Sequence, residues 1–333
     1  VAEEKDAAGK NTGVPEEIVG LGGANLDAEQ LRLEQVLRSG VEPRLPAHRF
    51  HAVEAQPGRH VLVLVVKQSW MGPHMVATAD SRFYARTSAG KYALDVTEIR
   101  AAFLQGEELP ARIRRFRDER LGLIASSETP VALRAGARVV LHLVPFSALG
   151  RGTTVDLAAW KKVAPPGLGG SSDGSMFNAD GHVVGEGRGD QSAQGYVQLF
   201  RSGALEAVYA HSHEVKGLRV MNVWAFESLL VEALSRYHRA FGEIGVLPPI
   251  SVALSLVGVR GYGLVYSARS DRGGRAVVVK DVVTLPDVVV EELDLEPAAV
   301  LRPIFDALWQ TFGLPRSLTY DEHGKWDPDR FNW

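Results

Sequence analysis

Residues 223–257 read VWAFESLLVEALSRYHRAFGEIGVLPPISVALSLV, a candidate helix followed at once by a candidate strand. Apolar residues recur every three or four positions from Val223 to Phe241, which predicts an amphipathic helix. After a turn that contains two prolines, Ile250–Val257 is rich in valine and leucine, as is typical of a buried strand. A helix and an apolar strand in direct succession predict a domain of mixed α and β structure.

The same alternation continues on both sides of this stretch. Downstream, Ala276–Val283 predicts a strand and Pro297–Phe312 a last helix. Upstream, the pattern predicts a long Pro/Gly/Ser-rich loop at Ala164–Ser175 and a hairpin turn within Phe177–His182. Strands are expected before and after them, at Ala137–Pro145, Tyr196–Phe200 and Leu205–Tyr209.

The first third of the chain predicts a similar mixture. A helix is expected to begin at Asp27 as N-cap and to end at Gly40, with Leu31, Leu33, Val36 and Leu37 on its apolar face. Residues 1–24 read as a loop. We further expect strands at Arg49–Ala55, at His60–Val66 (covered on both faces) and at Arg82–Arg86, then helices at Asp95–Phe103 and Glu107–Ala125.

These elements predict an α+β fold, a mixed sheet with flanking helices, in two α/β domains. The length of 333 residues fits about two domains at roughly 150 residues each. We expect one domain at 1–106, a connecting helix and strand at 107–150, and a C-terminal mixed α/β domain at 151–333.

Composition excludes several classes of chemistry. The chain has no cysteine, so disulfides, thiolate metal sites and cysteine nucleophiles are excluded. The longest aliphatic run, Val61–Val66, is far shorter than the roughly 20 residues of a membrane span, and a cytoplasmic protein without a membrane partner is expected. The net charge is −3, so a nucleic-acid partner would need a local basic patch.

Common catalytic and nucleotide-binding motifs are missing or weak. No phosphate-binding loop, dinucleotide fingerprint or serine-hydrolase elbow is present. His211 and His213 would share a face of a strand, but no third ligand has a recognisable spacing, so an exposed polar strand end is favoured over a metal site. Five arginines between Arg112 and Arg120 could grip phosphates, although nearby acidic residues favour a solvated helix face.

A second basic segment alternates with aromatic residues. Lys67, Arg82, Arg86 and Lys91 alternate with Trp70, Phe83 and Tyr84. Arginine binds phosphate and aromatic rings stack on bases, so this pattern is typical of a surface that binds a nucleic-acid backbone or single strand.

At this segment the chain resembles the Schlafen-type AlbA domain. The resemblance rests on the order and spacing of three motifs: HVLVLVVKQSWMGPH at 60–74, RFYARTS at 82–88 and DVTEI at 95–99. It covers roughly residues 1–106 and implies a bacterial nucleic-acid-binding protein with a regulatory or defence role. The implied binding residues are Lys67, Ser69, His74, Arg82, Tyr84 and Arg86, to which we add Lys91.

The resemblance also leaves two alternatives open. Val1 would correspond to the end of a strand inside the family's domain, so the two upstream glutamates of its nuclease members would be missing. Glu3, Glu4 and Asp6 then remain as candidate carboxylates for a metal-dependent nuclease, and no complete catalytic set or metal site is assigned. The family's ATP-binding label is the other alternative. A divalent metal or ATP is therefore expected as a cofactor only if the whole domain is intact. The sequence does not predict the oligomeric state.

Overall fold

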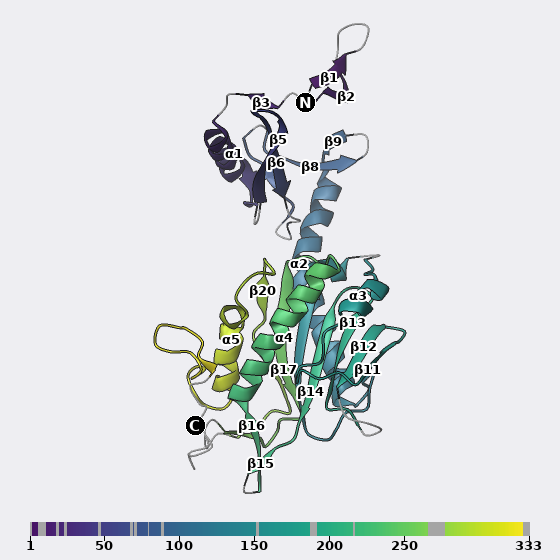
Figure 1. Ribbon diagram of the computed structural model, residues 1–333, viewed down its shortest axis with the longest axis vertical. Coiled ribbons are helices and arrows are strands. Elements are labelled where there is room, and N and C mark those ends of the chain that lie inside the picture. Colours follow the sequence, from purple (N-terminus) through teal and green to yellow (C-terminus); the bar gives the residue numbers. More distant parts are fainter. Residues whose placement is uncertain are drawn as a thin grey trace. The chain divides into compact units, whose positions relative to one another are not determined.

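The computed structural model describes residues 2–5, 11–17, 20–22, 25–45, 48–66, 69, 72–78, 80–87, 90–150, 153–186, 192–215, 217–265 and 277–328. The chain divides into two compact units, Val1–Glu108 and Leu109–Trp333 (Figure 1). Helices and several sheets occur along the chain, which confirms the α+β class.

An eight-stranded antiparallel sheet forms the centre of the second unit. Its strands follow the order β11-β12-β13-β14-β10-β17-β19, and β20 pairs with β17 beside β19. Their bounds are β10 (Ala137–Pro145), β11 (Gly174–Phe177), β12 (Gly181–Glu186), β13 (Gly195–Phe200), β14 (Leu205–His211), β17 (Ile250–Val257), β19 (Val282–Thr284) and β20 (Val288–Val290).

Helices cover both faces of this sheet. Helices α4 (Val223–Glu243) and α5 (Pro297–Gln310) pack on one face, and the second half of α2 (Val96–Ala125) packs on the other. Side chains alternate along β10, so Leu141 joins the α4 side and Val140 the α2 side. Because both faces are covered, β10 and β17 are apolar almost throughout, as the sequence predicted for their exact ranges.

Smaller elements complete the second unit. The predicted hairpin joins β11 to β12, and the Asn178 side chain accepts a 2.7 Å hydrogen bond from the Gly181 N–H. The unexpected helix α3 (Leu157–Val163) begins at Asp156, which accepts from the Ala158 and Ala159 N–H groups. The remaining elements are the 3₁₀ turn η1 (Phe146–Leu149) and the strands β15 (Glu214–Val215), β16 (Leu218–Asn222) and β18 (Gly263–Val265).

The first unit consists of short sheets, one helix and the start of α2. A hairpin of β1 and β2, a three-stranded sheet of β3, β6 and β5, and a four-stranded sheet of β4, β7, β8 and β9 are present. Their bounds are β1 (Ala2–Lys5), β2 (Asn11–Glu17), β3 (Leu21–Gly22), α1 (Leu26–Gly40), β4 (Val41–Glu42), β5 (His48–Gln56), β6 (Arg59–Val66), β7 (Met75–Val76), β8 (Arg82–Thr87) and β9 (Gly90–Ala93). The prediction of a loop over residues 1–24 was therefore wrong.

Helix α1 lies where it was predicted, but its cap differs. Asn25 and not Asp27 is the N-cap, and its side chain accepts a 3.2 Å hydrogen bond from the Ala28 N–H. Asp27 instead adds negative charge to the first turn, where the helix dipole favours it. Leu31 and Val36 were assigned to the apolar face, yet they are 56% and 48% exposed.

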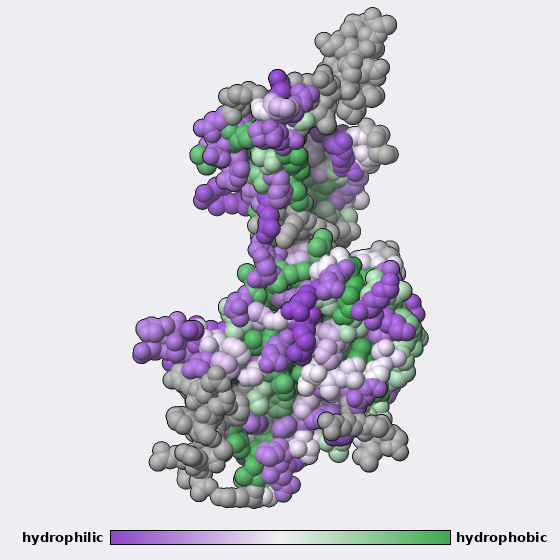
Figure 2. Space-filling model, in the orientation of Figure 1, coloured by the Kyte–Doolittle hydropathy of each residue, from purple (hydrophilic) through white to green (hydrophobic). Residues whose placement is uncertain are grey.

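The first unit leaves much apolar surface uncovered. Strand β6 is central in its sheet, as predicted, but Val63–Val66 are exposed, so the expectation that both faces are covered was wrong. Gly40 is the one buried residue among those whose burial is described in 1–108. Figure 2 shows the resulting apolar areas between hydrophilic residues.

Helix α2 replaces the two helices predicted at 95–103 and 107–125. It runs without a break through Pro110, although proline lacks the N–H for one helical hydrogen bond. Burial of Leu109, Ile113, Leu121 and Ile124 in the second unit stabilises the later turns against this loss. The segment 107–150, expected to connect two domains, thus belongs almost entirely to the second unit, where β10 lies between β14 and β17.

The strand predicted at Ala276–Val283 is also shorter in the structure. Ala276 lies outside the described residues, and β19 comprises Val282–Thr284 alone. Residues 277–281 instead run as an irregular segment, held where the Val278 N–H donates to the Tyr262 carbonyl. Within the described part of the chain, no helix is long and apolar enough to cross a bilayer.

Candidate nucleic-acid interface

The hairpin of β8 and β9 positions four of the seven predicted binding residues. Side chains alternate along a strand, so Arg82, Tyr84 and Arg86 point to one face of β8. Lys91 lies directly opposite Arg86 in the register of the pair, and therefore on that face. The four residues Arg82, Tyr84, Arg86 and Lys91 are hereafter the hairpin face.

The opposite face of β8 explains why this hairpin is ordered. Phe83 lies there, and its ring meets the ring of Phe103 of α2 edge-on, with centroids 5.7 Å apart. Strand β7 supports the other edge, because Met75 pairs with Phe83. One side of the hairpin is thus used for packing, and on the hairpin face the three cations are exposed while Tyr84 is half-buried.

One acidic residue, Asp80, modifies the charge of the hairpin face. Its carboxylate accepts a 2.5 Å hydrogen bond from the Tyr84 hydroxyl and lies 3.6 Å from the Arg82 Nε. The hydrogen bond to Asp80 raises the pKa of Tyr84. Sequence analysis did not select Asp80, since nothing in its position next to Ser81 marks it as a partner of both residues.

Arg86 and Lys91 carry the unneutralised charge of the hairpin face. Both side chains are exposed, and neither has an ion pair among the described residues. The Lys91 Nζ lies 5.4 Å from the centre of the Tyr84 ring, within the range of a cation–π contact. Two cations and one aromatic ring are therefore adjacent on an open strand surface.

The other three predicted binding residues lie outside the hairpin of β8 and β9. Lys67 lies outside the described residues. Ser69 is half-buried. His74 is also half-buried, and its Nδ1 donates to the Pro43 carbonyl across 2.6 Å, so this ring ties together the segments before β7 and after β4.

The candidate carboxylates for a nuclease have no described geometry. Glu3 and Glu4 lie in β1, but their side chains are outside the description, and so is Asp6 as a whole. Among the described residues, no group of three or more His, Asp or Glu could hold a metal ion. His211 ends β14, where its Nε2 donates to the Val220 carbonyl, and His213 follows as an exposed residue.

The arginines of α2 were expected to lie on one solvated helix face, and the structure does not show this arrangement. Arg112, Arg114 and Arg115 are exposed, and Arg112 donates to the Leu149 carbonyl, whereas Arg117 is largely buried. Arg120 turns toward the sheet and forms an ion pair with the fully buried Glu206, at 2.8 Å. Helical periodicity separates these residues around the axis, so a run in sequence is not a patch in space.

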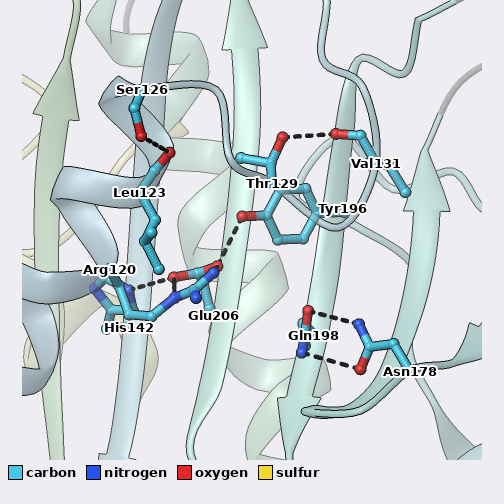
Figure 3. A network of polar contacts seen from close by, with 10 residues as sticks. All are labelled: Arg120, Leu123, Ser126, Thr129, Val131, His142, Asn178, Tyr196, Gln198 and Glu206. Atoms are coloured by element: carbon cyan, nitrogen blue, oxygen red, sulfur yellow. Dashed lines mark hydrogen bonds and ion pairs between the residues drawn. The ribbon is translucent and has the colours of Figure 1, made fainter.

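Arg120 belongs to a buried polar network under α2 (Figure 3). Its guanidinium donates two hydrogen bonds, of 2.9 and 2.8 Å, to the carboxylate of Glu206 in β14. His142 Nε2 and the Tyr196 hydroxyl also donate to this carboxylate, at 3.0 and 2.7 Å. A lone glutamate between Leu205 and Ala207 in an apolar strand was the sequence signal for such a network, and sequence analysis missed it.

The network fixes α2 on the sheet and offers no open binding position. Burial alone would raise the pKa of Glu206, but hydrogen bonds from Arg120 and His142 outweigh it and lower the pKa to about 2. The carboxylate is therefore ionised at every physiological pH. Because Glu206 and His142 are fully buried, these groups stabilise the fold and are not a candidate for substrate binding.

Comparisons with protein-family models, with curated proteins and with solved structures find no match to this chain. A function therefore has to be inferred from its own residues. Of the clusters described above, the hairpin face alone combines exposed cations with an aromatic ring.

Proposed function

We propose that this chain binds nucleic acid through the hairpin face. The observation that carries the proposal is the register of β8 and β9, which sets Arg86 opposite Lys91 beside the Tyr84 ring. Arg82 and Arg86 are four residues apart, about 13 Å along a strand, so their guanidinium groups can contact different phosphates. We also propose that the chain is a Schlafen-type AlbA protein of the bacterial cytoplasm with a regulatory or defence role.

Binding to phosphates predicts a strong dependence on salt. Labelled single-stranded RNA, single-stranded DNA and duplex DNA should each be titrated with the protein at 50 and 200 mM salt. The variant Arg86→Ala/Lys91→Ala removes two phosphate contacts, so the slope of log K against log salt should decrease by about 1 per contact.

The variant Arg114→Ala/Arg115→Ala is the matched control. It removes the same charge from exposed positions on α2, outside the hairpin face. Nearly unchanged affinity in this control and weakened affinity in the hairpin variant support the proposal. Loss of binding in the control alone would assign the interface to α2, and absence of binding by the wild type at 50 mM salt would reject nucleic-acid binding.

Asp80 offers a test in the opposite direction. The variant Asp80→Asn removes the negative charge beside Arg82 and keeps a side-chain oxygen that can accept from the Tyr84 hydroxyl. Affinity for a phosphate backbone should then increase, most clearly at 50 mM salt. Unchanged or weaker binding would contradict a role of the hairpin face.

A further inference from the structure

Strand β11 is a free edge of the eight-stranded sheet. It pairs with β12 on one side, and no other described strand pairs with it. All four residues are exposed, including Met176 and Phe177 with 53% and 51% of their surface open. Natural edge strands are usually protected from pairing with another chain by a lysine, a proline or a bulge. The sequence Gly-Ser-Met-Phe of β11 contains no lysine and no proline.

The backbone of β11 has hydrogen-bonding groups directed away from the sheet. The Asn178 N–H donates to the Gly181 carbonyl across 3.0 Å, which makes these two residues a hydrogen-bonded pair. Such pairs alternate along an antiparallel ladder, so Met176 bonds to β12 and its two neighbours do not. Ser175 and Phe177 therefore direct their N–H and C=O groups outward.

We propose that β11 pairs with β11 of a second copy of this chain. A two-fold axis perpendicular to the sheet, midway between the two copies of Met176, makes the two strands antiparallel and keeps each face of the sheet on the same side. Ser175 then lies opposite Phe177 of the partner subunit, and the outward groups of both residues form hydrogen bonds in pairs. Met176 lies beside the partner's Met176, so apolar surface that is exposed in the monomer is covered.

Charge at the two ends of β11 favours a second copy over an unrelated strand. Lys161 of α3 holds its Nζ 5.4 Å from the centre of the Phe177 ring, at one end of β11. Asp173, which is exposed, precedes the other end. Antiparallel pairing brings Asp173 of each chain toward the partner's Lys161, so the edge is complementary to itself in charge as well as in hydrogen bonding.

The length of β11 limits the strength of this dimer. A pair of four-residue strands covers less than the roughly 1,200–2,000 Å² of a standard interface. Because small interfaces belong to weak or transient associations, we expect a weak dimer, seen as a rise in the weight-average sedimentation coefficient as the protein concentration is raised from about 1 to 100 µM.

Sedimentation velocity over this concentration range tests the proposal on the full chain. Met176→Lys places two charges side by side at the axis and should keep the protein monomeric. Ser175→Pro removes an outward N–H without removing a bond to β12, and should do the same. Val289→Lys is the matched control, because Val289 is 50% exposed on β20 at the far edge of the same sheet.

The charges provide a test that does not depend on disrupting the strand. Asp173→Lys and Lys161→Asp should each weaken the dimer, since like charges then meet, and the double variant should restore it. Circular dichroism confirms that each variant is folded. A wild type that stays monomeric to 100 µM, or a dimer that persists in Met176→Lys and Ser175→Pro, would overturn the proposal.

Discussion

Arg120 shows how one residue can hold a helix to a sheet. Its side chain is 13% exposed, and it supplies two of the hydrogen bonds to the fully buried Glu206. In Arg120→Leu the carboxylate would stay buried without its guanidinium partner. Breaking a buried pair in this way costs about 3–5 kcal/mol, so the free energy of unfolding in urea should fall by that amount.

A matched substitution separates this effect from the loss of an arginine on α2. Arg114 lies on the same helix but is exposed, so Arg114→Leu should change the free energy of unfolding by no more than about 0.5 kcal/mol. Equal losses in the two variants would show that the pair with Glu206 contributes little.

Glu227 of α4 is the second buried carboxyl with a defined set of partners. It accepts hydrogen bonds from the Trp309 indole at 2.7 Å, from the Ser317 hydroxyl at 2.8 Å and from the Thr319 hydroxyl. Burial raises its pKa to about 8, although the hydrogen bonds from Ser317 and Trp309 oppose this shift. The folded protein therefore holds the proton at pH 7.

This raised pKa predicts that stability falls as the pH rises. The contribution of Glu227 is fully present below its ordinary pKa of 4.5 and is lost as the pH rises through about 8. As the pH rises from 6.5 toward 8, this lowers the free energy of unfolding by up to about 1.4 kcal/mol per pH unit, and the slope falls to about half of that at pH 8. Urea titrations of the wild type and Glu227→Gln over this range should show that the variant lacks this slope.

His238 does not interfere with this comparison. Burial lowers its pKa to about 4, so its contribution to stability is lost only as the pH falls from about 6.5 toward 4. Equal slopes for the wild type and Glu227→Gln would mean that Glu227 is already ionised in the folded protein at pH 7.

At the scale of elements, the pairing of β12 with β13 depends on a close backbone approach. A Cβ at Gly181 would lie 1.9 Å from the Leu199 carbonyl oxygen of β13, whereas a Cβ at Gly185 of the same strand would meet nothing within 4 Å. Gly181→Ala should therefore lower the melting temperature strongly. Gly185→Ala should have little effect or raise it slightly, because alanine restricts the unfolded chain. Similar melting temperatures for the two variants would contradict this packing.

Sequence periodicity predicted some elements well and others poorly, for physical reasons. The predicted ranges of β10 and β17 agree with the structure because both strands are apolar on two covered faces, which leaves a strong local signal. Helix α2 was predicted as two helices with a break at 104–106, a segment that contains the weak helix former Gly106, while the packing that keeps the helix continuous comes from distant strands. Local patterns do not contain such contacts.

The same limit applies to the candidate site. Alternation along Arg82–Arg86 was enough to place three residues of the hairpin face on one side of a strand. The roles of Asp80 and His74 depend on a turn and on the distant Pro43, and so were not predictable from spacing.

At the scale of the whole molecule, the two units differ in how completely they bury their strands. The first domain was predicted to end at residue 106, and the units divide after Glu108. That residues 109–150 belong to the second unit could not be read from the sequence, because the neighbours of β10 in the sheet, β14 and β17, follow much later in the chain. Every residue of β17 is buried, and Arg138 is the one partly exposed position of β10. In β5 and β6 no described residue is buried.

This difference predicts that the two units lose their structure at different free energies. Amide hydrogen exchange reports local opening, and opening is easiest where few apolar contacts hold a strand. Peptides that cover β5 and β6 should exchange within minutes, whereas those from β10 and β17 should exchange only through global unfolding of the second unit. Within α2, protection should rise after Leu109, where its side chains enter the core beneath the sheet. In a urea series, protection of the first unit should disappear first, and loss of protection at one common midpoint would instead show that the chain unfolds as a single cooperative unit.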